Sequence, residues 1–325
     1  MQYFRIYRKL VWLAIALLTC FFVACYSSSQ ETLKVGANIW PGDEPLYLAR
    51  DLGYFDDVSI KIIEYSAVPE LERAFQNGAI DMSINTLDRT LLFAEQDPDI
   101  RVWLLTDFSD GADAVVGQPE IKDLKDLKGR TIGLYPHFLS KLILFRALQS
   151  IDLTIDNVKQ LTVEANEQER IFANREIDAL ITSEPYISNL QNQGGKIIFD
   201  SQQMPREIID LIIGHKDLNN KFRKELQILV KGWFQALQYI QNHPDDAMRR
   251  MAERQGISTE QFSKSLEGLS FVNLQENQAL LSGKNPELYE GVQQLSALLI
   301  GENLMKQTVI PNTLFDDSIV KNIKP

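Results

Sequence analysis

The fold is decided by the stretch TLKVGANIWPGDEPLYLARDLGYFDDVSIKIIEY, residues 32–65. Apolar and polar side chains alternate over residues 32–39, which predicts a half-buried strand. Residues 40–45 hold two prolines and a glycine and form a turn, and apolar residues then recur at helical spacing up to Gly53. Residues 58–65 repeat the strand pattern. A strand, a tight turn, a helix and a second strand are the unit from which parallel α/β sheets are built.

The same alternation continues along the chain. Further strands are expected at 80–85, 102–108, 112–117, 131–135, 178–182, 196–200 and 208–214. From residue 218 onward the chain is almost wholly helical, with a long helix predicted at 219–242 that ends before Pro244. No Gly/Pro-rich linker separates the strand-rich blocks. We therefore expect two α/β lobes, joined by crossing strands and followed by a helical region.

The N-terminus predicts export and lipidation. Three basic residues precede an apolar run at 10–24, which is shorter than the roughly 20 residues of a membrane span. Ala24 precedes Cys25, and a polar segment follows, as at the cleavage site of a bacterial lipoprotein. We expect residues 1–24 to be a signal peptide and residues 25–31 a tether lipidated on Cys25, which places the protein in the periplasm or at the cell surface. The alternative is an ordinary signal peptide or an uncleaved anchor, with Cys25 incidental.

Composition excludes several classes of function. The formal charge of −11 becomes −14 once the three basic residues of the signal segment are removed, so nucleic acid is not an expected partner. Both cysteines lie at or before residue 25, which leaves the folded part without a thiol nucleophile or a cysteine metal site. The three histidines lack metal-ligand spacing, and the chain has no P-loop, dinucleotide fingerprint, nucleophile elbow or HExxH pair. We expect no catalytic residues, no metal and no cofactor.

Six short motifs follow one another in the exported chain. The first four are Val35-Gly36 leading to Trp40-Pro41-Gly42 with Glu44-Pro45, then Leu52-Gly53-Tyr54-Phe55, Gly78-Ala79-Ile80-Asp81 and Ser109-Asp110-Gly111-Ala112-Asp113-Ala114. The last two are Asp126-Leu127-Lys128-Gly129-Arg130-Thr131-Ile132-Gly133 and Ile177-Asp178-Ala179-Leu180, which runs into Ser183-Glu184-Pro185-Tyr186. Their order over about residues 32–300 resembles the periplasmic solute-binding proteins of ABC importers in the nitrate/sulfonate/taurine and thiamine-precursor (pyrimidine) group.

This resemblance implies a two-lobed periplasmic-binding-protein clamp of type II. Each lobe is then expected to be a mostly parallel sheet flanked by helices, with a helical C-terminal region packed on the first lobe. Residues 32–111 and 205–325 form lobe 1 in this interpretation, and residues 112–204 form lobe 2. The clamp would close over a small-molecule ligand, and its closed form would be recognised by an ABC permease in the membrane. We expect a monomer.

Candidate ligand-binding residues are those at the carboxyl ends of the predicted strands, where open α/β sheets bind ligands. We expect the following set to converge on one cavity: Trp40, Glu44, Thr86, Asp88, Asp110, Gly111, His137, Phe138, Ser140, Glu184 and Tyr186. Each also has a purely structural interpretation. Acids at helix starts are favoured by the helix dipole without any ligand, and Trp40 beside Pro41 is able to fill a core. For Ser140, at the start of the helix after His137, we expect a hydroxyl that contacts an anionic group.

The acidic character of this set favours a small organic ligand that contains nitrogen, such as an aminopyrimidine thiamine precursor. Simple inorganic anions are disfavoured, because unpaired carboxylates beside a buried anion are costly. A taurine-like or sulfonate-like zwitterion is the alternative ligand. Two other classes of protein are also considered: a receptor that senses its ligand without transport, and a thiamine-pyrimidine synthase-like enzyme. The enzymes that this fold group contains carry a cysteine-rich motif, which is missing here after Cys25.

Overall fold

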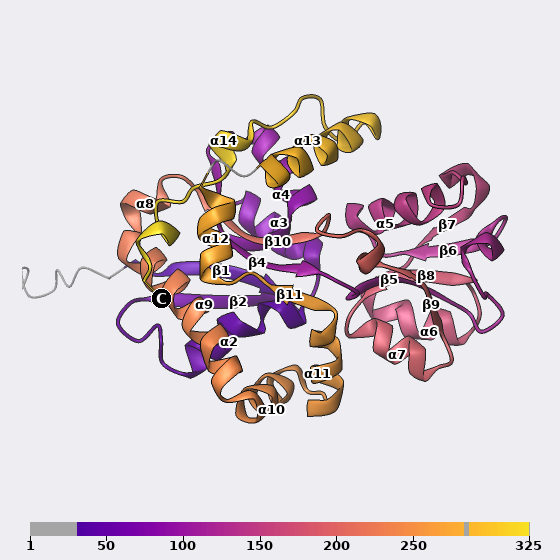
Figure 1. Ribbon diagram of the computed structural model, residues 1–325, viewed down its shortest axis with the longest axis horizontal. Helices are drawn as coiled ribbons and strands as arrows, with labels where there is room; N and C mark the ends of the chain where they lie inside the picture. The colour runs from indigo at the N-terminus through magenta and orange to yellow at the C-terminus, as the bar shows by residue number, and fades with distance from the viewer. Residues whose placement is uncertain (1–30, 283–285, 325) are drawn as a thin grey trace, which may run out of the picture. The chain divides into compact units, whose positions relative to one another are not determined.

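The computed structural model describes residues 31–282 and 286–324 (Figure 1). The predicted signal peptide, Cys25 and most of the tether lie outside these residues. Residues 33–325 form one compact unit. No helix within the described ranges is both long enough and apolar enough to cross a membrane.

The first sheet has six strands in the order β11-β4-β10-β3-β1-β2. Their bounds are β1 Leu33–Asn38, β2 Ile60–Tyr65, β3 Met82–Thr86, β4 Ile100–Ser109, β10 Ile209–His215 and β11 Leu269–Phe271. Strand β1 is parallel to β2 and β3, whereas β10 is antiparallel to β3 and β4, and β11 is antiparallel to β4.

The second sheet has five strands in the order β7-β6-β8-β5-β9. Their bounds are β5 Asp113–Gly117, β6 Thr131–Leu134, β7 Lys159–Thr162, β8 Ala179–Ser183 and β9 Lys196–Asp200. Strand β6 is parallel to β7 and β8, and β5 is antiparallel to β8 and β9.

Both sheets are mixed, so the expectation of mostly parallel sheets needs correction. The cause is the pair of crossings between the sheets. Strand β4 leads directly into β5, and the chain returns through β9 into β10. A strand that crosses from one sheet to the other runs antiparallel to the neighbouring strands of the βαβ units in the sheet that it joins. Strands β7 and β11 are not predicted by the sequence pattern, because they are only four and three residues long and lack a clear alternation.

Helices flank both sheets. Those of the two α/β blocks are α2 Glu44–Asp51, α3 Val68–Gln76, α4 Leu87–Gln96, α5 Phe138–Gln149, α6 Gln168–Ala173 and α7 Tyr186–Asn192. The C-terminal helices are α8 Leu218–Lys221, α9 Arg223–Asn242, α10 Pro244–Gln255, α11 Thr259–Glu267, α12 Leu274–Leu281, α13 Pro286–Gly301 and α14 Pro311–Leu314. Of these, α12 and α14 pack on β4, α9 packs on α2 and α13 packs on α4, so they cover the elements of the first sheet (Figure 1).

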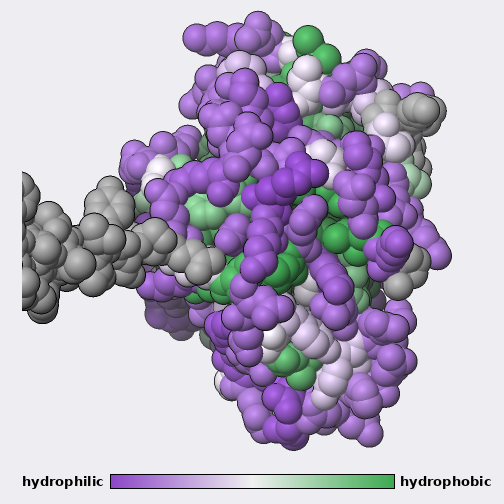
Figure 2. All heavy atoms as spheres, turned by 90° about the vertical axis from the view of Figure 1, so that its left-hand side faces the viewer, coloured by the Kyte–Doolittle hydropathy of each residue, from purple (hydrophilic) through white to green (hydrophobic). Residues whose placement is uncertain are grey.

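The long helix α9 shows why the C-terminal region folds onto the first sheet. Trp233 lies on its apolar stripe and is fully buried, and Phe234, Leu237 and Ile240 are partly buried against the same core. The face of the molecule at the left of Figure 1 is dominated by hydrophilic residues, with smaller hydrophobic patches between them (Figure 2). Scattered apolar side chains of this kind are ordinary on a folded surface and need no partner to explain them.

The two crossing segments are tied to each other and to the C-terminal region. The Ser201 hydroxyl accepts from the backbone N–H of Gly111 at 2.6 Å and lies 2.8 Å from the Ser109 hydroxyl. The carbonyl of Gly268 accepts from the N–H groups of Asp110 and Ala112, at 2.8 and 3.1 Å. Gly111 has a φ of +118°, a conformation that side chains other than glycine rarely adopt. The crossing therefore depends on a few small residues and backbone hydrogen bonds.

Candidate functional site

A cavity of about 90 Å³ is lined by residues from both sheets. The first sheet and the elements around it contribute Asn38, Trp40, Val68, Leu71, Ile84, Asn85, Thr86, Ile208 and Asp210, and the second sheet and its loops contribute Asp113, Tyr135, His137, Leu139 and Ser183. Most of these residues lie at or just beyond the end of a strand, which is where α/β folds bind ligands.

Two buried carboxylates face this cavity, Asp113 at the start of β5 and Asp210 near the start of β10. Burial raises the pKa of the Asp113 carboxyl to about 7. Burial, followed by the repulsion of nearby carboxylates, raises the pKa of Asp210 well above its ordinary value. The described residues that line the cavity include no lysine and no arginine. The site therefore concentrates acid groups without supplying their counter-charge.

Two further acids lie behind the Trp40 turn. Asp107 and Asp43 are fully buried, and neither carboxylate has a well-oriented hydrogen-bond donor among the described residues. Burial raises the pKa of both groups. Two neighbours act in the opposite direction and lower the pKa: the Trp40 indole acts on Asp107, and the Asn38 backbone acts on Asp43. The turn packs tightly here, since a Cβ on Gly42 would collide with the Trp40 indole and lie 2.5 Å from Asp107 Oδ2.

Aromatic rings form part of the cavity wall. The rings of Tyr135 and His137 stack with their centroids 5.8 Å apart and an interplanar angle of 11°. Trp40 lines the cavity from the first-sheet side. Flat walls of this kind suit a planar ring, because stacking adds to the area that a ring buries.

The N-terminus of α5 is already occupied by the protein itself. His137 Nδ1 accepts a hydrogen bond from the Leu139 N–H at 3.3 Å. The Ser140 hydroxyl donates to the carbonyls of Tyr135 and His137, at 2.9 and 2.8 Å, instead of pointing to a ligand. Burial lowers the pKa of His137, whose Nε2 lies 3.7 Å from Glu72 Oε1. A neutral imidazole and a capped helix leave little here to bind an anion.

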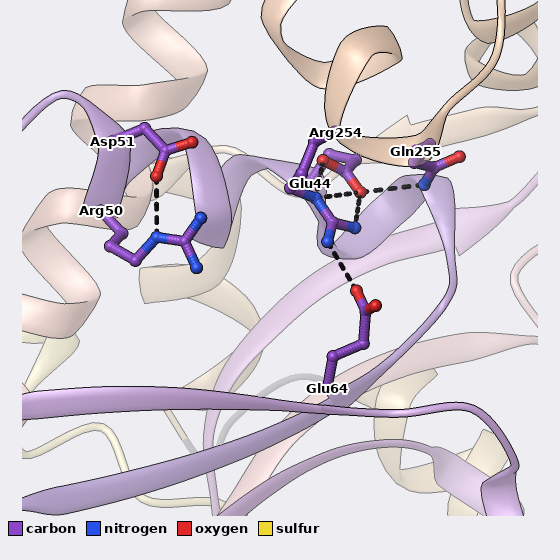
Figure 3. A network of polar contacts seen from close by, with 6 residues as sticks. All are labelled: Glu44, Arg50, Asp51, Glu64, Arg254 and Gln255. Carbon is purple, nitrogen blue, oxygen red and sulfur yellow. Dashed lines mark hydrogen bonds and ion pairs between the residues drawn. The ribbon is translucent and has the colours of Figure 1, made fainter.

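Glu44 is placed away from the cavity, in a network with the C-terminal region (Figure 3). Its carboxylate accepts from the guanidinium of Arg254 on α10, with Nε to Oε2 at 2.7 Å, and from the amide nitrogen Nε2 of Gln255, with Nε2 to Oε1 at 2.9 Å. Arg254 also donates to Glu64 at 2.6 Å and lies over the Tyr47 ring, 3.7 Å from its centroid. Glu44 therefore holds α10 against α2 and does not face the cavity.

The other predicted residues are divided between the cavity and its surroundings. Trp40, Thr86 and His137 line the cavity, while Asp88 is buried near it. The negative charge of Asp88 acts to raise the pKa of both Tyr135 and His137, although burial outweighs this effect at His137 and lowers its pKa. Asp110 is exposed and lies with Gly111 at the crossing. The predicted set thus converges only in part.

Three predicted residues of the second sheet have contacts of their own. The Glu184 carboxylate accepts from the backbone N–H and the hydroxyl of Ser188, at 3.2 and 3.0 Å, inside the first turn of α7. Tyr186 begins the same helix and is partly exposed. Phe138 lines a second cavity, of about 130 Å³, together with residues of α5 and α13.

Several cavity residues are not among the candidates predicted from the sequence. They are Asn38, Val68, Leu71, Ile84, Asn85, Asp113, Tyr135, Leu139, Ser183, Ile208 and Asp210. A usable signal existed for Asp210, and for Asp107 behind it, because each is the single acid of a strand that is almost entirely buried. An acid at such a position must be paired, protonated or functional.

Among the described residues, one group has the geometry to hold a metal ion, namely Asp97, Asp99 and His215. Asp99 already pairs with Lys216 at 2.7 Å, and the group lies at the end of β10 remote from Asp210. Exposed acids close to a lysine are ordinary surface chemistry, so this group is not part of the candidate site.

Comparison with solved structures identifies the fold. The alkanesulfonate-binding protein SsuA from Xanthomonas axonopodis pv. citri, bound to MOPS, matches with a TM-score of 0.71 at 15% identity over 87% of this chain and 97% of that chain. The periplasmic aliphatic sulphonate binding protein SsuA from Escherichia coli gives 0.73 at 18% identity, over 89% and 93%. The desulfurization enzyme DSZB gives 0.66 at 16% identity, over 89% and 98%, so one fold carries both binding proteins and an enzyme.

Sequence comparison adds the family. No curated protein matches the sequence. The profile of the NMT1/THI5-like family matches residues 40–247, which include every strand from β2 to β10 and all the cavity residues except Asn38. The predicted resemblance to periplasmic solute-binding proteins of ABC importers is confirmed, and the chain belongs to the NMT1/THI5-like family.

Proposed function

We propose that this protein is an extracytoplasmic solute-binding protein that delivers a small, nitrogen-containing organic ligand to an ABC permease. The observation that carries this proposal is the pair Asp113 and Asp210, which face the cavity with no lysine or arginine among its described lining residues. A protonated amine, an amidine or an aminopyrimidine supplies the N–H donors that such carboxylates lack. The aromatic walls then hold the ring by stacking.

A sulfonate fits this cavity less well than a nitrogenous ring. The SsuA proteins that share the fold are named for sulfonate ligands. A sulfonate needs a cation or several free N–H donors, whereas the first turn of α5 is capped by His137 and two acids face the space. A taurine-like zwitterion could place its ammonium on the acids, but its sulfonate would have no donor set of comparable quality.

The size of the cavity also favours a small solute. Its volume of about 90 Å³ is below the roughly 300–1,000 Å³ of drug-sized sites and below the about 150 Å³ that holds benzene in an engineered protein core. We propose a ligand of about one ring, with modest movement of the lobes on binding. The acids and the rings would then contact the ligand from both sheets.

Binding and transport are proposed here in preference to catalysis. DSZB shows that the fold is able to carry an enzyme. In this chain the residues after Cys25 include no cysteine, and the sequence contains no nucleophile elbow and no HExxH pair. A sensory receptor without transport would use the same cavity, and a neighbouring permease and ATPase gene pair would distinguish the transporter.

A binding panel tests the ligand class. Thermal unfolding of the purified protein is measured with 4-amino-5-hydroxymethyl-2-methylpyrimidine, the 5-aminomethyl analogue, taurine, an alkanesulfonate and nitrate. A ligand at 100 times its dissociation constant stabilises the native state by about 2.7 kcal/mol, which is easily detected. We expect the aminopyrimidines to stabilise the protein, and Asp113→Asn and Asp210→Asn to reduce that effect more than the exposed control Asp245→Asn. Stabilisation by nitrate or the alkanesulfonate alone would refute the proposal.

The membrane tether is a separate part of the proposal. We propose that a lipid on Cys25 keeps a monomeric binding protein close to its permease, since tethering raises effective concentration without adding contacts. Expression of the full chain and of Cys25→Ser, followed by separation of membrane and soluble fractions, tests this point. The unchanged chain should sediment with membranes and Cys25→Ser should be released; equal release of both would contradict lipidation.

A further inference from the structure

Asp107 and Asp210 stand directly opposite each other on neighbouring strands. They are a register pair of the antiparallel strands β4 and β10. The next pair is Leu211 with Leu105, so Thr106 is an extra residue in a β-bulge beside them. Side chains that are opposite in an antiparallel pair project from the same face and lie about 5 Å apart at Cβ. The bulge therefore aims two carboxyl groups at the same small volume.

Among the described residues, no lysine or arginine lines the cavity beside these two carboxyl groups. Asp107 is fully buried, and the neutral groups near it are the Trp40 indole N–H and the Thr106 hydroxyl. The other titratable groups described near the pair are the acids Asp43 from the turn before α2, Asp88 from α4 and Asp113 from β5, and the phenol of Tyr135 after β6. The His137 imidazole also lines the cavity, but burial lowers its pKa and so disfavours its charged form. Arg254 acts on Asp43 but is bound to Glu44 and Glu64.

Two ionised carboxylates in such a place would repel each other strongly. Directly opposed like charges destabilise a sheet, and burial strengthens the repulsion because no water screens it. Neighbouring carboxyls resolve this conflict by keeping one proton between them, as a hydrogen-bonded acid and carboxylate. Asp210 lies within reach to act on Asp107 as a hydrogen-bond partner.

We propose that Asp107 and Asp210 share one proton in the ligand-free protein, and that an N–H donor of the ligand replaces this proton when it binds. Asp210 lines the cavity, so a ligand reaches it directly, whereas Asp107 lies behind it. A protonated N–H group of the ligand then donates to Asp210, its positive charge takes the place of the shared proton between the two carboxylates, and that proton leaves to solvent. The pair would select against ligands without an N–H group, which cannot replace the proton.

The first test needs no ligand. In protein labelled with ¹³C at the aspartate carboxyl carbons, the signals of Asp107 and Asp210 are followed from pH 3 to pH 9 and assigned with Asp107→Asn and Asp210→Asn. We expect both signals to move together, with one titration step near the ordinary value of an aspartate and one well above it, so that about one proton is held at pH 6. In each variant the amide replaces the shared proton, and the remaining carboxyl should titrate in a single step that is no longer coupled to a partner. Two independent titrations near pH 4, or no ionisation of either group by pH 9, would overturn the proposal.

The second test measures the proton that leaves. This part of the inference rests on the proposed function, so it uses 4-amino-5-hydroxymethyl-2-methylpyrimidine as the probe. Titration calorimetry at pH 6 in two buffers of different ionisation enthalpy gives the number of protons exchanged on binding. The unchanged protein, and the control Asp245→Asn, should release about one proton more per ligand than Asp107→Asn does.

The results of the two tests distinguish a failure of the proposed ligand class from a failure of the proposed proton replacement. If the probe does not bind while the carboxyl signals still titrate together, the proposed ligand class fails and the shared proton stands. If the probe binds with equal proton exchange in the unchanged protein and in Asp107→Asn, the replacement of the proton by the ligand is refuted and the nitrogenous ligand stands.

Discussion

At the scale of the residue, Asp113 shows how a buried acid links folding to pH. Burial raises the pKa of its carboxyl from 3.8 to about 7 in the folded protein. The unfolded chain loses this proton above its ordinary pKa, while the folded chain retains it. The contribution of Asp113 to stability is therefore complete below about pH 4 and is lost as the pH rises towards 7.

Substitution of Asp113 by asparagine should remove this pH dependence. Relative to Asp113→Asn, the free energy of unfolding of the unchanged protein should fall between pH 4 and pH 7, by up to about 1.4 kcal/mol for each pH unit. Urea unfolding of both proteins at half-unit steps measures the difference. Asp245→Asn, an exposed acid on α10, serves as the control and should give a constant difference. Parallel curves for Asp113→Asn would show that Asp113 is ionised in the folded protein.

At the scale of the element, one asparagine continues the hydrogen bonding of β4 where its neighbour strand ends. Asn277 on α12 is fully buried; its Oδ1 accepts from the Leu105 N–H at 2.9 Å, and its Nδ2 donates to the Leu105 carbonyl at 2.8 Å. Strand β11 pairs with β4 only at residues 107–109, so the side chain satisfies backbone groups that no strand reaches.

Asn277→Leu should therefore destabilise the protein despite its similar size. Two buried backbone groups of Leu105 would lose their partners, at about 1–3 kcal/mol each. The expected loss is about 2 kcal/mol or more in urea unfolding. Gln275→Leu, an exposed position on the same helix, is the control and should change stability by less than about 0.5 kcal/mol. A loss no greater than that of the control would mean that β4 does not depend on this side chain.

The network of Figure 3 joins helices that are about 200 residues apart in the chain. The Arg254 side chain is 19% exposed and its partner Glu44 is fully buried. Arg254→Met would leave the Glu44 carboxylate buried without its cation, and we expect a loss of about 3–5 kcal/mol. The double variant Glu44→Gln, Arg254→Met should recover much of it.

The comparison variant for this network is Arg249→Met, which breaks exposed pairs with Asp246 and Glu253 on the same helix. Exposed pairs contribute about 0–1 kcal/mol, so this variant should remain close to the unchanged protein. Chemical unfolding of the unchanged protein, Glu44→Gln, Arg254→Met and the double variant gives the coupling energy between Glu44 and Arg254, with Arg249→Met as the control. A double variant no more stable than Arg254→Met would show that the buried charge is not the cause of the loss.

At the scale of the whole molecule, the connection between the two sheets passes through a tight backbone contact. A Cβ on Gly268 would lie 2.6 Å from the Ala112 nitrogen and 2.9 Å from the Gly111 carbonyl carbon, and backbone atoms cannot move aside cheaply. The same Gly268 carbonyl accepts hydrogen bonds from Asp110 and Ala112. This contact positions the crossing from which the cavity receives Asp113.

Gly268→Ala should disturb both stability and binding. We expect a loss of about 1–3 kcal/mol in thermal or urea unfolding from the steric conflict, and weaker binding of whichever panel ligand the unchanged protein retains. Gly291→Ala is the control, because nothing lies within 4 Å of its added Cβ and alanine is the better helix former on α13. If Gly268→Ala matches the control in both measurements, the crossing has more freedom than the contact implies.

Local sequence patterns were enough to predict part of the fold and part of the candidate site. The order of strands and helices, the long helix before His243-Pro244 and the acidic character of the strand ends followed from periodicity and turn residues, which neighbouring residues determine. The resemblance of six motifs led to the family. The lobe boundaries at 111/112 and 204/205, and the lipid on Cys25, stay predictions.

By itself, then, the sequence determined the class of fold, the family and the surplus of acids over bases near the strand ends. Only the tertiary structure decided that Glu44 pairs with Arg254, that the sheets are mixed, and that Asp107 and Asp210 oppose each other across β4 and β10. The physical reason is that periodicity reports which face of an element is buried, whereas pairing and charge compensation depend on residues brought together from distant parts of the chain.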